Sequence, residues 1–538
     1  MSPKLLTLGN AQINLAFHSL MRNFATQKMF CRMKKLKYFA AVLVALLVTA
    51  CGSKNESLEK MIPADATGVV SIDVPSILKK AQLLQDGDIA IPAELQQVMD
   101  ENDAAVLCQS ITDLPVMGID TGSKAFAFFT VKTFGRVLLV PLSDEDAARK
   151  TLSQRLGTDF ETVEGLSCVY QQDNLYAIKD GVLMVGTVNM PIEKEKAART
   201  ALGMFQRNGR SILEVDQVKD CLNAEGEVNA YLQLDGIKAL LKRSTTYKEV
   251  ARRMPLLEVF TESDIKAMTC AVKLNEANAT IDTHFIVDEG SDYLKLMKST
   301  IAKPDASFLK VIPNSMNYVM AMSVNGKQFT QLAQIQQLLK AFAKIPFIGK
   351  LNLGQMLATI DGPVAVALAR DPYLQGDWNA VIAARSSQPA EVVNTIGRFA
   401  QSMGQAPELY DGEYVYQYDN KMIKVGASDG VVYLKMLNYE QTEGYAGDDV
   451  AMNDLFSKAA VAVSAHTQAG KTDAYFRYGL ADMIDGHGTF TASGDTPVAL
   501  ALLKVLCSIK PAGAFDDMID EDTSSAIGAA IDGFHELN

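Results

Sequence analysis

The alternation of apolar and polar residues predicts short strands joined by tight turns. Phe126 to Lys132 and Arg136 to Leu142 each have the pattern of a strand, and the short link between them suits a hairpin. The arrangement recurs at Ser167 to Gln171 and Leu175 to Lys179, where the turn Asp173-Asn174 has residue types that tolerate tight backbone angles. Because such short turns connect antiparallel neighbours, the pattern predicts an antiparallel sheet.

Helices are expected between these hairpins. Ser143 to Asp146 places a capping residue and acidic side chains ahead of Ala147 to Leu156, where they suit a helix N-terminus and its dipole. A strand at Ala380 to Ala384 precedes a helix at Ala390 to Met403, and another helix is expected at Lys327 to Leu339. The pattern therefore favours an α+β fold, a mainly antiparallel sheet with packed helices, over a doubly wound parallel sheet.

The same order of signals appears twice. Ile62-Pro63 precedes a strand and a helix, and Ile312-Pro313 precedes a second strand and helix. Three further pairs of segments match at near-equal spacing: Tyr170 to Asn174 with Tyr416 to Asn420, Asp180 to Val182 with Asp429 to Val431, and Ala230-Tyr231 with Ala474-Tyr475. The preserved order predicts two tandem related units, residues 61–303 and 304–538, that meet near Lys303-Pro304-Asp305.

A segment before Cys51 has the layout of a lipoprotein signal. The basic positions Lys34, Lys35 and Lys37 precede an apolar run from Phe39 to Val48, and small residues then lead to a cysteine in Val48-Thr49-Ala50-Cys51. The apolar run is too short for a transmembrane helix, which needs about twenty residues. The segment is therefore expected to be an export signal.

This interpretation divides the first sixty residues. Residues 1–50 form a leader whose true start we expect at Met33, because a basic region preceded by some thirty residues would be abnormal. Cleavage is expected between Ala50 and Cys51, with lipid on Cys51 as the membrane anchor. The polar, small residues after Cys51 predict a flexible tether at 51–60.

The lipidation signal is followed closely by Ile62 to Ala66, a Val-rich strand at Val69 to Val74 and an amphipathic helix at Ile77 to Leu84. Together with Cys51, these segments resemble a family of lipoproteins from Gram-negative anaerobes of the gut type, known as a domain of unknown function. The resemblance implies a protein of the cell envelope, lipid-anchored to the outer membrane and either periplasmic or surface-exposed. It carries over no catalytic residue.

The charge of the chain bears on its partners. Of the 51 Lys and Arg, 7 lie in the leader, which leaves 44 against 63 Asp and Glu and gives the remaining chain a net charge of −19. Nucleic-acid binding depends on clustered cations that neutralise phosphates. We therefore exclude nucleic acid as a partner and expect an envelope protein or a glycan, with the membrane contacted through the lipid.

Two sets of residues are weak candidates for a site. Asp485 and His487, in Asp485-Gly486-His487-Gly488, could hold a metal or move a proton, although a polar turn is the simpler interpretation. Tyr414, Tyr416 and Tyr418 alternate along one strand and could stack on a sugar, although packing against a helix is again simpler. The sequence contains no GxSxG elbow and no phosphate-binding glycine loop, so we predict no catalytic residue and no cofactor.

The sequence is compatible with two functions. The first is a non-enzymatic, lipid-anchored binding or scaffold protein, which accounts for the anchor, the duplication and the lack of a nucleophile paired with a base. The alternative is an envelope hydrolase or a metal-dependent enzyme, whose site would form only in three dimensions around Asp485 and His487.

Overall fold

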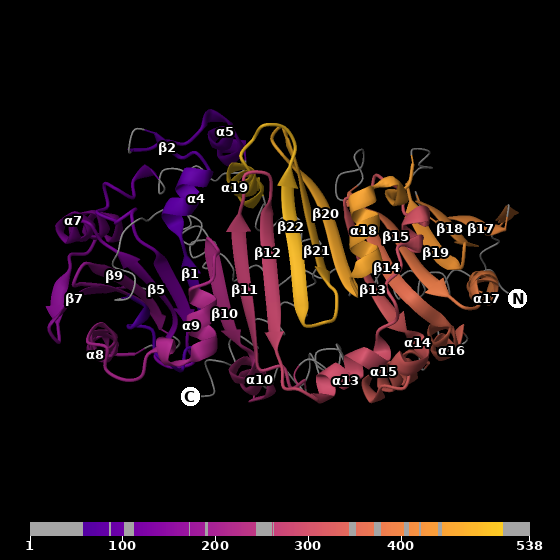
Figure 1. The fold of residues 1–538 in the computed structure, drawn as a ribbon, viewed down its shortest axis with the longest axis horizontal. Coiled ribbons are helices and arrows are strands. Elements are labelled where there is room, and N and C mark those ends of the chain that lie inside the picture. The colour runs from indigo at the N-terminus through magenta and orange to yellow at the C-terminus, as the bar shows by residue number, and fades with distance from the viewer. Residues whose placement is uncertain are drawn as a thin grey trace, which may run out of the picture. The chain divides into compact units, whose positions relative to one another are not determined.

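A computed structural model describes residues 58–508, except 86–87, 102–111, 172, 189–191, 244–260, 262, 344–350, 371–377, 403–407, 411, 419–420 and 439–443. The chain forms two compact units, residues 1–254 with 503–538 and residues 255–502. Figure 1 shows the elements of both. The boundary expected at 303/304 divides the two sequence repeats and not these two compact units. That boundary stays a prediction.

The first unit holds an antiparallel sheet with the strand order β10-β1-β4-β5-β9-β8-β7-β6. Its strands are β1 (Gly68–Ile72), β4 (Ala125–Phe129), β5 (Phe134–Pro141), β6 (Glu161–Val163), β7 (Leu166–Gln171), β8 (Asn174–Lys179), β9 (Val182–Val188) and β10 (Val228–Gln233), with β2 (Leu84–Gln85) and β3 (Asp88–Ile89) as a separate pair. Its helices are α4 (Val74–Lys80), α5 (Ala93–Glu101), α7 (Glu145–Leu156), α8 (Lys194–Phe205), α9 (Asp216–Leu222), α10 (Leu234–Arg243) and the 3₁₀ turn η2 (Ile212–Glu214).

The second unit holds an antiparallel sheet with the order β11-β12-β22-β21-β20-β13-β14-β15-β19-β18-β17-β16. Its strands are β11 (Ala267–Leu274), β12 (Ala279–Ile286), β13 (Tyr318–Asn325), β14 (Ile360–Arg370), β15 (Trp378–Ser386), β16 (Glu408–Tyr410), β17 (Glu413–Tyr418), β18 (Lys421–Ser428), β19 (Val431–Leu437), β20 (Val461–Ala469), β21 (Thr472–Leu480) and β22 (Asp485–Ala492). The predicted α+β class with a mainly antiparallel sheet is confirmed.

Helices join these strands and pack on the sheet. They are α13 (Asp292–Thr300), α14 (Gly326–Phe329), α15 (Ala333–Ala343), α16 (Leu353–Ala358), α17 (Pro389–Ser402) and α18 (Val450–Lys458), with the 3₁₀ turns η3 (Ser307–Val311) and η5 (Ala446–Asp448). A last helix, α19 (Val498–Ser508), runs across the boundary between the units. The helix expected at Lys327 to Leu339 is in fact two, α14 and α15, because α14 ends at Phe329.

The two units share a strand order. In the first unit it runs β6-β7-β8-β9-β5-β4-β1-β10, and in the second β16-β17-β18-β19-β15-β14-β13-β20. The turn before β9 and the turn before β19 are both Asp-Gly with positive φ at both residues, at Asp180-Gly181 and Asp429-Gly430. This is the backbone that a two-residue hairpin of type I′ requires.

One of the sequence matches was wrong. Ala230 and Tyr231 lie in β10, which pairs with β1, whereas Ala474 and Tyr475 lie in β21. The strand that pairs with β13 is β20, one strand earlier. The match is one strand late, because β21 follows β20 after the short turn Gly470-Lys471.

The first described residues, 58–60, lie within the segment expected to be a flexible tether. Leu58 is buried, and its carbonyl accepts a hydrogen bond from the Met61 backbone N–H. The described end of the segment expected at 51–60, residues 58–60, is therefore part of the folded unit.

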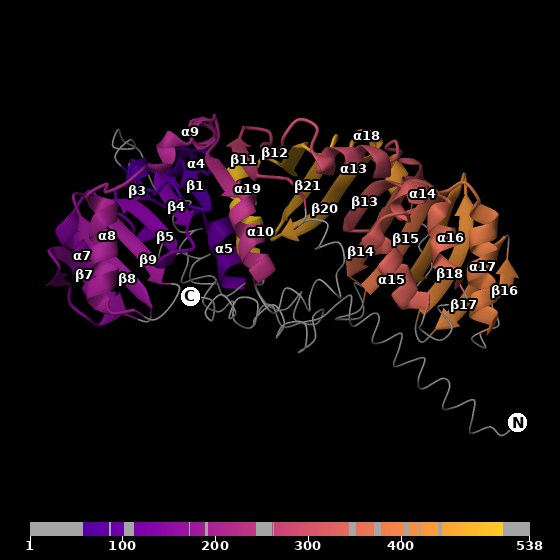
Figure 2. The same cartoon turned by 90° about the horizontal axis from the view of Figure 1, so that it is seen from below.

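The core of the second unit lies on one face of its sheet. Phe308 of η3 and Phe456 of α18 meet edge to face, with ring centroids 5.2 Å apart, over small residues of β13, β14 and β15. Figure 1 shows α18 in front of this part of the sheet. On the opposite face α17 covers β18 and β19, where Val392 and Val393 contact Val425 and Val432. Figure 2 shows α15, α16 and α17 beside the sheet from below.

Candidate functional site

The two polar residues singled out in the sequence lie in a ladder of His–Asp pairs. Strands β12 and β22 are antiparallel, and their register sets His284 opposite Asp485 and Asp282 opposite His487. In each pair the histidine Nδ1 lies 2.7 Å from the carboxylate Oδ1. Each strand thus carries Asp-x-His, and the antiparallel register matches each aspartate with the histidine of the other strand.

The interpretation of Asp485-Gly486-His487-Gly488 as a polar turn was wrong, because these residues are in strand β22. The glycines are explained by the Tyr478 ring, which crosses β22 on the face opposite the pairs. A Cβ on Gly486 would lie 2.0 Å from Tyr478 Oη, and one on Gly488 would lie 2.9 Å from the same ring. Glycine is therefore required by close packing, not by turn flexibility.

The side chains of the ladder are exposed, and too few possible ligands come together in it to form a metal centre. The side chains of its four members are 52 to 66% exposed. Within the described residues no group of three or more His, Cys, Asp or Glu could hold a metal ion. Its geometry is that of two cross-strand pairs, each of which adds modest stability to the β12–β22 junction.

A second polar cluster lies on β20 and β21, on the face of the sheet that carries the His–Asp pairs. It was not predicted from the sequence. The His466 ring stacks on Tyr475 with centroids 4.7 Å apart, and its Nε2 lies 3.3 Å from Asp473 Oδ1. The Arg477 guanidinium lies 5.4 Å from the Tyr475 ring centroid. It also donates a hydrogen bond of 2.9 Å to Asp449, at the start of α18. The alternation of Asp473, Tyr475 and Arg477 was the available signal.

Two tyrosines of β17, Tyr414 and Tyr416, pack as the simpler interpretation expected. Tyr414 and Tyr416 contact the apolar cluster beneath α17, and burial raises the pKa of Tyr416. The Tyr414 ring lies against Gly397 and its hydroxyl reaches Asn394 over 3.4 Å. For Tyr418 the structure gives the backbone register alone, opposite Lys421. Tyr414 and Tyr416 do not form an exposed row for a sugar.

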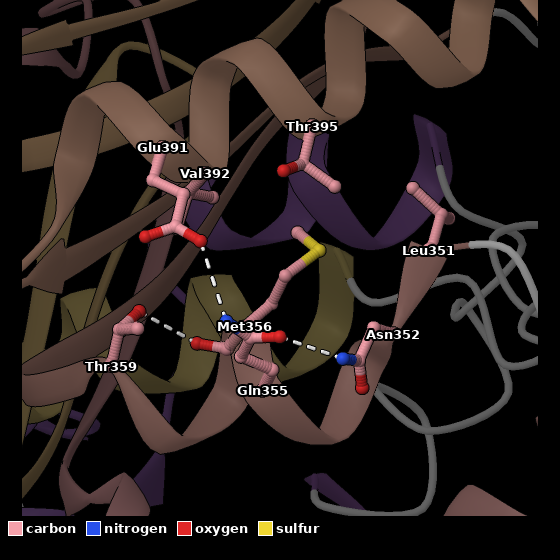
Figure 3. Close-up of a pocket in the computed structure, with 8 residues that line it drawn as sticks. All are labelled: Leu351, Asn352, Gln355, Met356, Thr359, Glu391, Val392 and Thr395. Atoms are coloured by element: carbon pink, nitrogen blue, oxygen red, sulfur yellow. Dashed lines mark hydrogen bonds between the residues drawn. The ribbon is translucent and has the colours of Figure 1, made fainter.

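A small pocket lies between α16 and α17, and Figure 3 shows its lining. It has a volume of about 40 Å³, little more than the ~30 Å³ that one water occupies in the liquid. Gln355 links its two sides, because its amide donates to Glu391 over 3.3 Å and its oxygen accepts from Asn352 over 2.7 Å. The pocket is small, and its polar lining suits bound water.

The second unit also has an exposed apolar sheet face. Met320, Val366 and Ile382 stand in one row across β13, β14 and β15, on the side away from α18. Met320 is 53% exposed and Ile382 is 44% exposed. Tyr318 and Leu368 form the neighbouring row, and Tyr318 is also 44% exposed. We call this surface, on β13, β14 and β15, the open apolar face.

The residues expected to carry the anchor, Ala50 and Cys51, and the expected start at Met33 lie outside the described residues. Among the described helices, none combines the length and the apolar character needed to cross a membrane.

Comparisons with known proteins add little. No family model matches the chain, and no curated protein does. Two solved structures of the protein TP0453 are similar over part of the chain. Crystal form III gives a TM-score of 0.28 at 11% identity, covering 44% of this chain and 84% of that one. Form IV gives 0.26 at 12% identity, covering 42% and 79%. TM-scores this low carry no argument about fold or function.

Proposed function

We propose that this chain is a lipid-anchored protein of the cell envelope that binds another molecule and has no catalytic role. The lipoprotein signal that ends at Cys51 supports the anchor, with the outer membrane as its site and the periplasm or the cell surface as the compartment. The observation that carries binding is the open apolar face, because soluble domains rarely leave a large, continuous apolar surface uncovered.

The body of the protein is proposed to be a tandem duplication. The shared strand order and the paired Asp-Gly turns support this. So do two matching hydrogen bonds: Ile212 N–H to the Ile62 carbonyl over 2.9 Å, and Ala446 N–H to the Ile312 carbonyl over 2.8 Å. In each case the carbonyl of the residue before a proline accepts a hydrogen bond from the first residue of a 3₁₀ turn, η2 in the first unit and η5 in the second.

No observation favours the alternative of an envelope hydrolase or metal-dependent enzyme. Asp485 and His487, its best candidates, are each paired with a side chain of β12 on an exposed sheet face. Such a place offers no exclusion of water, on which an activated base or metal-bound nucleophile depends.

The anchor is tested by expressing the chain and its Cys51→Ala variant in a Gram-negative host and separating membranes from soluble proteins. We expect the wild-type chain in the membrane fraction, with an N-terminal peptide that carries diacylglycerol and acyl mass on Cys51, and the variant without either. A Cys51 peptide of unmodified mass, or a variant that stays on the membrane, would contradict the proposal. Protease treatment of intact cells then separates a surface location from a periplasmic one.

A further inference from the structure

We propose that the open apolar face binds the acyl chain of an anionic amphiphile, such as a fatty acid or a phospholipid. The inference names a ligand class for the proposed binding function. It does not depend on lipid at Cys51, because it concerns the folded second unit alone.

Strand β14 carries small side chains on its covered face and larger ones on its open face. On the covered face β14 presents Ala365, Ala367 and Ala369, which are 0, 0 and 4% exposed. On the open face the same strand presents Val366 and Leu368, both half-buried. Large apolar side chains on the uncovered side of a sheet cost free energy in water, at about 25 cal/mol per Å². The face is therefore built to be covered.

In the described strands, the backbone of this surface has no free hydrogen-bonding groups to offer a partner. The surface is the face of a sheet, and its strands already use their backbone groups to pair with neighbours on both sides. An extended peptide laid on such a face would bury N–H and C=O groups without partners, which is costly. A hydrocarbon chain has no polar groups to satisfy, so it gains the full benefit of burial.

An arginine and a tryptophan lie beside the open apolar face where the hairpin of β14 and β15 ends. Trp378 and Arg370 stand opposite each other in that hairpin, on the same side as Ile382. The Arg370 guanidinium lies 5.5 Å from the Trp378 ring centroid, and Lys421 donates to the Trp378 carbonyl. In a chain with a net charge of −12, the Arg370 guanidinium beside the apolar face fits an anionic headgroup. A second copy of the chain would offer the same cation and the same net negative charge.

The test is binding of cis-parinarate, an anionic acyl chain that becomes fluorescent in apolar surroundings, to the purified full-length chain. Wild-type protein is expected to give a saturable rise in fluorescence that palmitate reverses. Met320→Asp and Ile382→Asp should weaken binding by roughly tenfold or more, because each places a carboxylate against the chain. The matched control is Val450→Asp on α18, where an exposed valine is replaced away from this face.

The headgroup site is tested separately with Arg370→Ala. This variant should bind parinarate severalfold more weakly, while competition by the uncharged 1-hexadecanol stays as in the wild type. Circular dichroism and thermal melts of each variant establish that the fold is intact.

Three results would overturn the inference. They are a lack of saturable binding by the wild type, binding by Ile382→Asp at wild-type strength, and a wild-type dimer that Ile382→Asp converts to a monomer while neither binds parinarate. The last would assign the face to a second copy. None of these results bears on the anchor, which the mass of the Cys51 peptide tests independently.

Discussion

Tyr478 Oη and Thr283 Oγ1 lie 2.5 Å apart and share a hydrogen bond across strand β22. The bond joins two strands that are not neighbours, because β22 lies between β21 and β12. The phenol ring can cross β22 only because Gly486 and Gly488 lack side chains beneath it. Two glycines that suggest a flexible loop in the sequence are thus part of a packed sheet.

Gly486→Ala is expected to destabilise the second unit by about 1–3 kcal/mol, because the new methyl group overlaps the Tyr478 hydroxyl. The free energy of unfolding from urea melts measures the cost. The matched control is Gly203→Ala in α8, where the added Cβ meets open space, and this change should stabilise by about 0.5–1 kcal/mol. In a Tyr478→Phe background the cost of Gly486→Ala should shrink. An equal cost in both backgrounds would show that the hydroxyl is not the obstacle.

The His–Asp pairs should contribute little to stability and nothing to metal binding. A double-mutant cycle with His284→Ala and Asp485→Ala should give a coupling of about 0.2–1 kcal/mol, because both side chains are more than half exposed. Added Zn²⁺ should leave the melting temperature of the wild type unchanged. A rise in melting temperature that His487→Ala abolishes would refute this and revive a metal site.

Asp305 should make the second unit sensitive to acid. Burial raises the pKa of its carboxyl, but this is outweighed by hydrogen bonds from the Ser307 backbone N–H and hydroxyl and by the Arg385 guanidinium, so the pKa lies below its ordinary value. The stability it confers is therefore present above the unfolded pKa of about 3.9 and is lost as pH falls through the lower folded pKa.

Asp305→Asn tests this linkage. The variant should be less stable than the wild type at pH 7, and the difference should close in more acidic buffer as the wild type becomes protonated. Asp292→Asn, at an exposed helix start, is the control. A stability difference that is constant with pH would mean that Asp305 acts through packing, not through its charge.

Phe456→Ala should be among the most damaging single changes in the second unit. The side chain is 2% exposed and meets Phe308 edge to face, and its removal leaves a cavity that costs about 3–5 kcal/mol. Val450→Ala on the same helix is the control, since Val450 is 81% exposed. Similar losses for the two variants would contradict the assignment of the core to this face.

The local elements could be predicted from the sequence because their causes are local. Asp144 caps α7 by accepting bonds from the Asp146 and Ala147 N–H groups, as the acidic run before that helix indicated. The hairpin of β7 and β8 was likewise evident from its turn residues. Such signals depend on a few consecutive residues, which a reader of the sequence can see together.

The candidate site could not be predicted, because its causes are distant in sequence. The partner of His487 is Asp282, 205 residues earlier, and the reason for Gly486 is a ring on another strand. The open apolar face was hidden for a different reason. Strand β14 is apolar on both sides, so its pattern does not indicate which side is covered, and the larger Val366 and Leu368 suggest the wrong one.

The pairing of β12 with β22 has a meaning for ancestry. Both strands carry the motif Asp-x-His, in Asp282-Thr283-His284 and in Asp485-Gly486-His487. In antiparallel pairing, two copies of this motif place each aspartate opposite a histidine. A strand with that property can join two identical subunits about a two-fold axis. Under the tandem duplication that we propose, this junction corresponds to the two-fold interface of an ancestral dimer, now contained in a single polypeptide. Its formation then no longer depends on protein concentration, and each half was free to diverge without losing its partner.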